Sequence, residues 1–390
     1  MSRYTRTPFL VVFPDTSAAR DTYGGTGESV ALEAHLLRGA AESETAIVFM
    51  HPIGGGAYLP MTNALAKAGH HVVYCNSRYR GNDSALLMEK VAEDLAACVR
   101  HVREELGYRK VVLAGWSGGG SLSVFYQEQA ERPTVTAAPS GDGPDLTALD
   151  MPAADGLMLL AAHVSRHQTL TEWLDASILD ERDPSVRAPE LDLYDPANPN
   201  QPPYSAEFLE RYRAAQIARN RRITAWAEAM LARLRAAGRP LAEFGFVVHG
   251  TMADPRWLDP AVDPNDRVPG SCYLGDPEVV NMSPVGLARF TTLRGWLSQW
   301  SYDRGNADGV RAAAGVTVPV LVIGNTADDA CTPSHTRRLH EAFVNTKAER
   351  YDIAGATHYY AGPDQREHLA EAVGRITDWL RRHDFAEVTR

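Results

Sequence analysis

The chain has 390 residues, 44% of them hydrophobic and 23% charged, which is the composition of an ordinary globular protein. Its formal net charge of −10 argues against a nucleic-acid or anionic-membrane partner, because either would require a basic surface. The N-terminal apolar run that ends at Pro14 is too short for a signal peptide or a membrane span, and the four cysteines form no C-x-x-C pair. We therefore expect a cytoplasmic protein with reduced thiols.

Short apolar runs alternate with helical patterns over residues 45–164. The runs at 46–50, 71–75, 111–114 and 156–162 predict strands. Between them, helical patterns cover 60–68 and 86–106, and a further helix is expected from Ser121. Alternation of this kind predicts a parallel sheet covered by helices.

The alternation stops after residue 164 and resumes near residue 315. Residues 165–314 contain an acidic, proline-rich stretch at 180–203 and a long helical pattern at 205–237. Ser283 and Pro284 predict the start of another helix, which would run to about Trp300. Strands are then expected at 318–324 and 350–353, with helices from 333 and over 365–382. We therefore expect an α/β domain made of residues 1–164 and 315–390, interrupted by a mainly helical insert, residues 165–314.

A serine lies at the turn between an expected strand and an expected helix. The sequence G-W-S-G-G, residues 115–119, follows the apolar run at 111–114 and precedes the helical pattern from Ser121. Glycines permit a bend in which other side chains would clash, and the bend exposes the serine oxygen beside the first amides of the helix. Ser117 is therefore the candidate nucleophile, and Trp116 beside it is a candidate for substrate contact.

A serine nucleophile needs a base, and the base needs a group that orients it. In an open α/β sheet these side chains are expected at the carboxyl ends of the strands. Asp328 and Asp329 follow the strand at 318–324, and His358 follows the strand at 350–353. The order Ser, Asp, His along the chain is typical of this kind of sheet. We expect His358 to be the base and favour Asp328, which is nearer the strand end, with Asp329 as the alternative.

An oxyanion formed during acyl transfer needs backbone N–H donors. One candidate is Gly118, the residue after the nucleophile, and the other should come from the loop after the first expected strand, which reads H-P-I-G-G-G at 51–56. Because Pro52 has no N–H, Ile53 or Gly54 is expected to supply the second bond. Elsewhere, two histidines at 163 and 167 have a spacing that suits a metal pair, but no H-E-x-x-H motif or nearby cysteine accompanies them, so no metal or cofactor is expected.

With these motifs in this order, the chain resembles serine hydrolases of the α/β-hydrolase fold, specifically esterase- or lactonase-like members. The resemblance covers about 240 residues, and it implies that the insert is a cap, or lid, over the active site. Members commonly have His-Gly where this chain has His51-Pro52. The sequence R-G-N-D-S at 80–84 is similar to the R-G-x-G-x-S loop of many members, with Asp83 in place of the second glycine.

An aromatic stripe lies in the second half of the insert. Phe290, Leu293, Leu297 and Trp300 recur at helical spacing, with Trp296 beside them. Such a stripe is typical of core packing, but lids commonly contribute aromatic walls to a pocket. We therefore predict that Trp296 or Trp300 lines an apolar substrate pocket.

These features together predict a serine hydrolase that cleaves a carboxylic ester or lactone of a small molecule with an apolar or aromatic group. Thioester hydrolysis, acyl transfer and carbon–carbon bond hydrolysis stay open, because the same three side chains perform them. A non-catalytic binding protein on this scaffold is disfavoured, since a binder needs no base with an acid to orient it. The sequence leaves the substrate's identity open, and also whether the chain forms a homo-oligomer.

Overall fold

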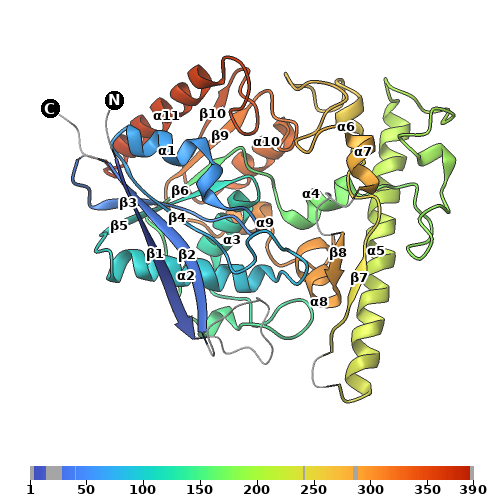
Figure 1. Cartoon of the computed structure of the whole chain (residues 1–390), viewed down its shortest axis with the longest axis horizontal. Coiled ribbons are helices and arrows are strands. Elements are labelled where there is room, and N and C mark those ends of the chain that lie inside the picture. Colours follow the sequence, from blue (N-terminus) through green and yellow to red (C-terminus); the bar gives the residue numbers. More distant parts are fainter. Residues whose placement is uncertain (1–3, 15–28, 40, 240–241, 284–288, 387–390) are drawn as a thin grey trace.

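The computed structural model describes residues 4–14, 29–39, 41–239, 242–283 and 289–386, in which eight strands form one large sheet (Figure 1). The strand order is β1-β2-β4-β3-β5-β6-β9-β10. The first two strands are antiparallel to their neighbours, and the strands from β4 to β10 pair in parallel. The strands are β1 (Thr5–Pro14), β2 (Ser29–Arg38), β3 (Thr45–Phe49), β4 (His71–Cys75), β5 (Lys110–Trp116), β6 (Gly156–Leu160), β9 (Val320–Asn325) and β10 (Ala348–Ile353).

The mostly parallel sheet confirms the fold class predicted from the alternating pattern. Every residue of β3, β4, β6 and β9 is buried, as expected for strands covered on both faces. The hairpin of β1 and β2 was not predicted. Most of β1 is exposed, and β2 alternates buried and exposed residues, so neither strand contains the continuous apolar run that identified the others.

Helices cover both faces of the sheet (Figure 1). One layer consists of α1 (Pro60–Lys67) and α11 (Gln365–Arg382), which pack on each other and on the sheet. The opposite layer contains α2 (Met88–Glu104), α3 (Gly118–Glu131), α9 (Gly309–Ala313) and α10 (Pro333–Ala342). Two apolar cores follow from this arrangement, one beneath each layer.

The chain between β6 and β9 leaves the sheet and returns to it at a neighbouring strand, because β6 pairs directly with β9. The regular elements of this β6–β9 segment are mostly helices, and the longest of them, α5, lies at the edge of the molecule away from the sheet (Figure 1). Its regular elements before α9 are α4 (Arg166–Trp173), α5 (Ala206–Ala236), β7 (Gly245–Val247), α6 (Pro255–Leu258), α7 (Pro277–Met282), β8 (Phe290–Thr292), α8 (Leu293–Gly295) and a π-helical turn (Trp296–Trp300). Short 3₁₀ turns occur at Gly56–Tyr58, Leu146–Ala148 and Pro189–Leu191. No helix in the described ranges is long and apolar enough to cross a membrane.

The helix expected from Ser283 to Trp300 is wrong over most of its length. Ser283 ends α7 instead of beginning a helix, and Pro284 lies outside the described residues. Phe290, expected in a helical stripe, is in β8, where it pairs with β7 and is 55% exposed. The helical turns begin only after Thr292, whose side chain accepts a hydrogen bond from the amide of Gly295 and so caps α8.

Candidate active site

Ser117 lies at the turn from β5 into α3 with a backbone conformation that few side chains adopt, φ 51° and ψ −118°. The glycines around it permit this bend. A Cβ on Gly115 would overlap the carbonyl of Gly119, and a Cβ on Gly119 would lie 2.5 Å from the carbonyl oxygen of Met50. The G-x-S-x-G sequence therefore forms a tight turn that presents the serine at the carboxyl end of the sheet.

His358 and Asp328 come together at the same end of the sheet. His358 Nδ1 lies 2.7 Å from Asp328 Oδ2, and both side chains are buried. The other carboxylate oxygen, Asp328 Oδ1, accepts hydrogen bonds from the amides of Ala330 at 2.8 Å and Cys331 at 2.7 Å. The carboxylate is therefore held in one orientation, with one oxygen turned to the histidine.

The neighbouring acid, Asp329, makes no recorded hydrogen bond to His358 within the described ranges. Its backbone carbonyl accepts a hydrogen bond from the indole of Trp257 at 2.7 Å. Burial, followed by the neighbouring Asp328 carboxylate, raises the pKa of Asp329 to about 6. Of the two acids that the sequence left open, Asp328 is the one that contacts the histidine.

The charge state of His358 depends on two opposing effects. Burial lowers the pKa of His358, but the Asp328 carboxylate more than offsets this, so the pKa is raised above its usual value of 6.5. Trp116 contributes to the packing, with its ring edge against the imidazole at a centroid distance of 6.1 Å. Trp116 also lines the pocket described below, and its contact with substrate stays a prediction.

Ser117 Oγ lies 3.9 Å from the sulfur of Cys331, and no hydrogen bond to His358 is recorded among the described residues. Such serine–histidine bonds are often long before substrate binds. Cys331 itself is a poor nucleophile here, because burial raises the pKa of its thiol well above the usual value. Ser117 and His358 both line one pocket, which brings the predicted nucleophile and base to a common space.

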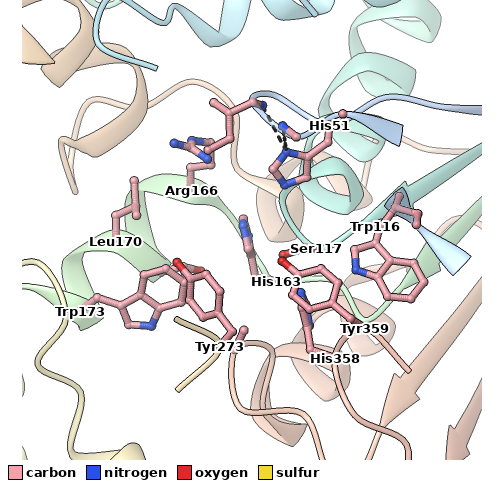
Figure 2. Close-up of a pocket in the computed structure, with 16 residues that line it drawn as sticks. His51, Trp116, Ser117, His163, Arg166, Leu170, Trp173, Tyr273, His358 and Tyr359 are labelled. Atoms are coloured by element: carbon pink, nitrogen blue, oxygen red, sulfur yellow. Dashed lines mark hydrogen bonds between the residues drawn. The ribbon is translucent and has the colours of Figure 1, made fainter. Parts of the chain in front are cut away.

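The predicted second oxyanion donors are directed elsewhere. The amides of Ile53 and Gly54 donate to Nδ1 of His51, at 3.1 and 2.7 Å (Figure 2). These bonds make Nδ1 an acceptor, and burial lowers the pKa of His51 to about 3, so the neutral ring carries its proton on Nε2. The prediction that Ile53 or Gly54 faces the oxyanion is therefore wrong in this structure, because the preceding histidine ring already accepts both donors.

The proton-bearing nitrogen of His51 lies above the first turn of α3. A Cβ placed on Gly118 would lie 3.0 Å from His51 Nε2 and 3.1 Å from His163 Nε2. Gly118 begins α3, so its amide has no acceptor within the helix. The Gly118 amide and the His51 N–H are therefore close neighbours beside Ser117.

The pocket has a volume of about 160 Å³. One face of α4 forms much of its wall, through Arg166, Thr169, Leu170 and Trp173 (Figure 2). These four residues were not predicted, although their spacing of i, i+3, i+4 and i+7 directly after a predicted strand is typical of one face of a helix. The remaining lining residues are His51, Ile53, Gly54, Gly55, Leu59, Trp116, Ser117, His163, Tyr273, Ala330, His358 and Tyr359.

Trp296 and Trp300 do not line this pocket, contrary to the prediction. Both have no exposed surface and stack on each other with their centroids 5.5 Å apart, within an apolar core behind α4. The indole of Trp296 also donates to Thr224 of α5 at 3.0 Å. The π-helical turn packs against α4 and α5, so both rings are buried between helices.

The two histidines with metal-pair spacing are separated by the fold. His163 lines the pocket, whereas His167 Nε2 lies 3.4 Å from the carboxylate of Asp308.

Asp83, the residue that replaces a glycine in the R-G-N-D-S sequence, has a partner on the pocket wall, since its carboxylate lies 2.9 Å from Arg166 Nη2.

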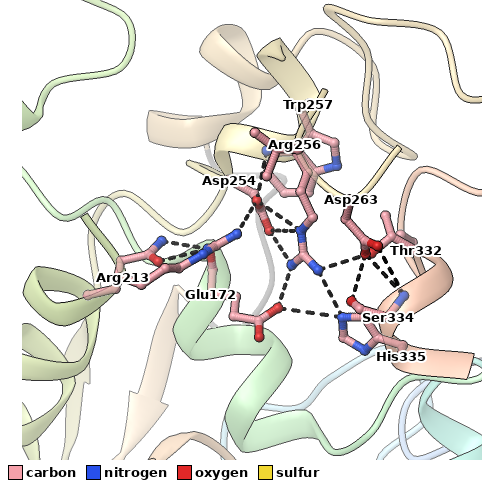
Figure 3. Close-up of polar contacts among 12 residues, drawn as sticks. Glu172, Arg213, Asp254, Arg256, Trp257, Asp263, Thr332, Ser334 and His335 are labelled. Atoms are coloured by element: carbon pink, nitrogen blue, oxygen red, sulfur yellow. Dashed lines mark hydrogen bonds and ion pairs between the residues drawn. The ribbon is translucent and has the colours of Figure 1, made fainter. Parts of the chain in front are cut away.

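A buried polar network fixes α4 relative to the α/β core (Figure 3). Arg256 of α6 forms ion pairs with Asp254 and with Glu172 of α4. The same guanidinium lies 3.0 Å from Thr332 Oγ1 and 3.1 Å from Nε2 of His335, on α10. Because Arg256 and Asp254 are buried, breaking their pair would leave an uncompensated charge, which typically costs about 3–5 kcal/mol.

Comparison with known proteins agrees with this fold. A family model described as "alpha/beta hydrolase fold" matches residues 45–140. Among solved structures, the chain is similar to the α/β hydrolase GrgF from Penicillium sp. sh18, with a TM-score of 0.52 and 13% identity over 97% of this chain and 99% of that chain. It is also similar to the siderophore hydrolase EstB from Aspergillus fumigatus, with a TM-score of 0.49 and 14% identity over 91% of this chain and 95% of that chain. No curated protein matches the sequence.

The family match spans β3 to α3 and the turn that carries Ser117. Outside that range, the sheet continues in parallel through β6, β9 and β10. From the match, the sheet and the similarity to GrgF, the chain has the α/β-hydrolase fold.

Proposed function

We propose that the chain is a serine hydrolase that cleaves a small carboxylic ester or lactone through an acyl-enzyme intermediate. The observation that carries this proposal is the hydrogen bond between His358 Nδ1 and Asp328 at the pocket that Ser117 also lines. A histidine held by a buried carboxylate beside a serine on a strained turn is the arrangement needed to activate a hydroxyl. The α/β-hydrolase fold supports hydrolase activity in general, and these three side chains support the serine mechanism.

In the proposed reaction, His358 Nε2 takes the proton of Ser117 as the oxygen attacks the carbonyl carbon. The imidazolium then gives this proton to the leaving alcohol, and an acyl group stays on Ser117. Water then attacks the acyl carbon as it loses a proton to His358. The bond between this carbon and Ser117 Oγ breaks, the imidazolium returns the proton to Oγ, and the acid leaves. Asp328 keeps the ring proton on Nδ1, so that Nε2 is free to accept, and its negative charge stabilises the imidazolium.

We propose that the oxyanion is bound by the amide of Gly118 and by the Nε2–H of His51. The bonds from Ile53 and Gly54 to His51 support this assignment, because they fix the tautomer that donates from Nε2. The neutral state follows from burial, which lowers the pKa of His51 to about 3. A donor held in place before the reaction contributes more than one that must reorient, and removing one such donor typically costs about 10²–10³-fold in kcat.

The volume and walls of the pocket support a short acyl group. A cavity of about 150 Å³ accommodates a molecule the size of benzene, which is close to the 160 Å³ of this pocket. Aromatic side chains from Trp116, Trp173 and Tyr273 line it. An acyl group of about six non-hydrogen atoms with some apolar surface therefore fits the space better than a long lipid chain.

A covalent label tests the proposal. Purified protein should hydrolyse p-nitrophenyl acetate or butyrate, and a fluorophosphonate should label it at Ser117. Ser117→Ala should abolish both, whereas Ser121→Ala, which changes another serine in the first turn of α3, should still be labelled. Full labelling or full activity of Ser117→Ala would contradict the assigned nucleophile. A parallel series of short thioesters distinguishes esterase from thioesterase activity.

A further inference from the structure

The pocket wall is rich in hydrogen-bond donors and contains no carboxylate side chain. Its sixteen lining residues, all within the described ranges, include one arginine and three histidines but no aspartate or glutamate. Two more polar groups in this wall, Thr169 Oγ1 and the hydroxyl of Tyr273, are buried with no recorded partner in the described part of the chain. The wall is therefore suited to a substrate that brings acceptor oxygens, although the chain as a whole carries a net charge of −10.

Arg166 is the charged group in this wall. Its side chain is only 4% exposed, and its Nη2 donates to Asp83 at 2.9 Å and to Gln299 at 2.7 Å. Its Nε also donates to Gln299, at 3.2 Å. No bond from Nη1 is recorded to any residue that the structure describes, so this nitrogen keeps two unbonded N–H groups on a side chain that lines the pocket (Figure 2).

The charge of Arg166 is less well compensated than that of another buried arginine nearby. Arg256 contacts two carboxylates, those of Asp254 and Glu172, which more than offset the effect of burial, so its pKa is raised. Arg166 contacts one carboxylate, that of Asp83, and burial outweighs it, so the pKa of Arg166 is lowered. A second anion next to Arg166 would therefore bind favourably in this poorly solvated site.

We propose that Arg166 binds a carboxylate of the substrate through Nη1, so that the substrate is a half-ester of a short dicarboxylic acid. This inference rests on the proposed ester hydrolysis and names its substrate class. A carboxylate matches the geometry and charge of guanidinium N–H groups. The pocket volume of about 160 Å³ limits the chain between the two carboxyl groups to a few carbons.

Matched ester pairs test this inference in the wild-type protein. The anionic substrates are the monoethyl esters of succinic, glutaric and adipic acids. Each is paired with the ester in which a carboxamide replaces the far carboxylate, so that size is preserved and only the charge is lost. Ethanol release gives kcat and KM. We expect at least one anionic ester to exceed its amide partner by about 10- to 100-fold in kcat/KM, the range for a hydrogen bond to a charged group in a buried site.

Three variants test whether Arg166 causes the preference for the anionic ester over its amide partner. Arg166→Gln should reduce the ratio of anionic to amide ester to about 1, mainly through a higher KM for the anionic ester. Arg166→Lys should restore part of the ratio. Arg338→Gln is the matched control, because it removes an arginine of α10 that does not line the pocket and whose recorded hydrogen bond goes to Gln168, and the ratio should stay at the wild-type value.

The outcomes separate this inference from the proposed function. Hydrolysis of the amide esters at the rate of the half-esters, at all three lengths, overturns the carboxylate site but leaves the serine hydrolase intact. An unchanged ratio in folded Arg166→Gln overturns the role of Arg166. If Arg166→Gln does not fold, the ratio of kcat/KM for the anionic ester to that for the amide ester in the wild-type protein decides whether the carboxylate site exists. If fluorophosphonate labels Ser117 but neither ester turns over, protection from labelling by glutarate but not by glutaramide supports the site, and equal protection overturns it. Failure of labelling and of all turnover removes the proposed function itself.

Discussion

The assignment of Asp328 as the acid that orients His358 predicts a large loss of activity in Asp328→Asn. The same change at the neighbouring Asp329 is the control. In Asp328→Asn, the amide oxygen should keep the place of Oδ1, because it accepts from the amides of Ala330 and Cys331. Reversing the amide would place its NH₂ against both of those donors, at a cost of about 1–3 kcal/mol for each lost bond. The NH₂ group is therefore expected to face His358.

An NH₂ group in that position would donate to Nδ1 of His358 and force the ring proton onto Nε2. A ring protonated at Nε2 cannot accept the proton of Ser117, so the base is lost while the fold is preserved. An aspartate-to-asparagine change of this kind lowers kcat by about 10⁴-fold in another serine hydrolase, or about 5.4 kcal/mol at 1.36 kcal/mol per tenfold. Asp329→Asn removes a carboxylate with no recorded bond to His358 and should change kcat by less than about tenfold.

The assay measures kcat for p-nitrophenyl acetate and the rate of fluorophosphonate labelling for wild type and both variants, with thermal unfolding to establish that each is folded. Equal losses in the two variants would refute the orientation argument. So would a loss below about tenfold in Asp328→Asn.

Three further predictions concern the same pocket. Because the pKa of His358 is raised above 6.5, kcat/KM should fall as pH decreases through an apparent pKa above 6.5, and a pH–rate profile whose acid limb lies below pH 6 would contradict this. Gly118→Ala brings a methyl group within about 3.1 Å of two histidine ring nitrogens and should lower kcat in a folded protein. In Gly120→Ala the new Cβ overlaps a core alanine, and this overpacking should destabilise the protein by about 1–3 kcal/mol and so lower its melting temperature. Equal melting temperatures for the two variants would refute the distinction. Trp300→Ala should destabilise the protein by about 3–5 kcal/mol in denaturant unfolding and leave KM unchanged. Trp173→Ala, at the pocket wall, should raise KM. A raised KM in Trp300→Ala would show that Trp300 contacts the substrate after all.

The sequence predicted the parts of this protein that depend on local pattern. Buried parallel strands are continuous apolar runs, so β3 to β6 and β9 were identified within a few residues of their bounds. Ser117 was identifiable because its glycines lie at fixed offsets. Asp328 and His358 were identifiable because side chains that follow parallel strands meet at one edge of a sheet.

The rest depended on contacts that no local pattern encodes. Trp296 and Trp300 have the spacing of a pocket wall and of a core stripe alike, and only the position of α5 decides between them. The donor role expected of Ile53 and Gly54 failed because the ring of His51 turns back onto its own loop, a rotamer that the sequence does not specify. No helix was predicted at α4, and the sequence did not say which of its side chains would face the pocket.

The ion-pair network around Arg256 has a consequence for engineering this enzyme. Arg256 and His335 are buried, and with Glu172 they form contacts across the boundary between the β6–β9 segment and the core, so we expect that the segment cannot be exchanged intact with that of a relative. A transplanted or shortened segment would leave His335 of α10, and Thr332 just before that helix, without their partner Arg256, and it would favour aggregation over a new specificity. Selectivity is better altered one side chain at a time on the inner face of α4, where a library of four positions keeps every buried charge of this network in place.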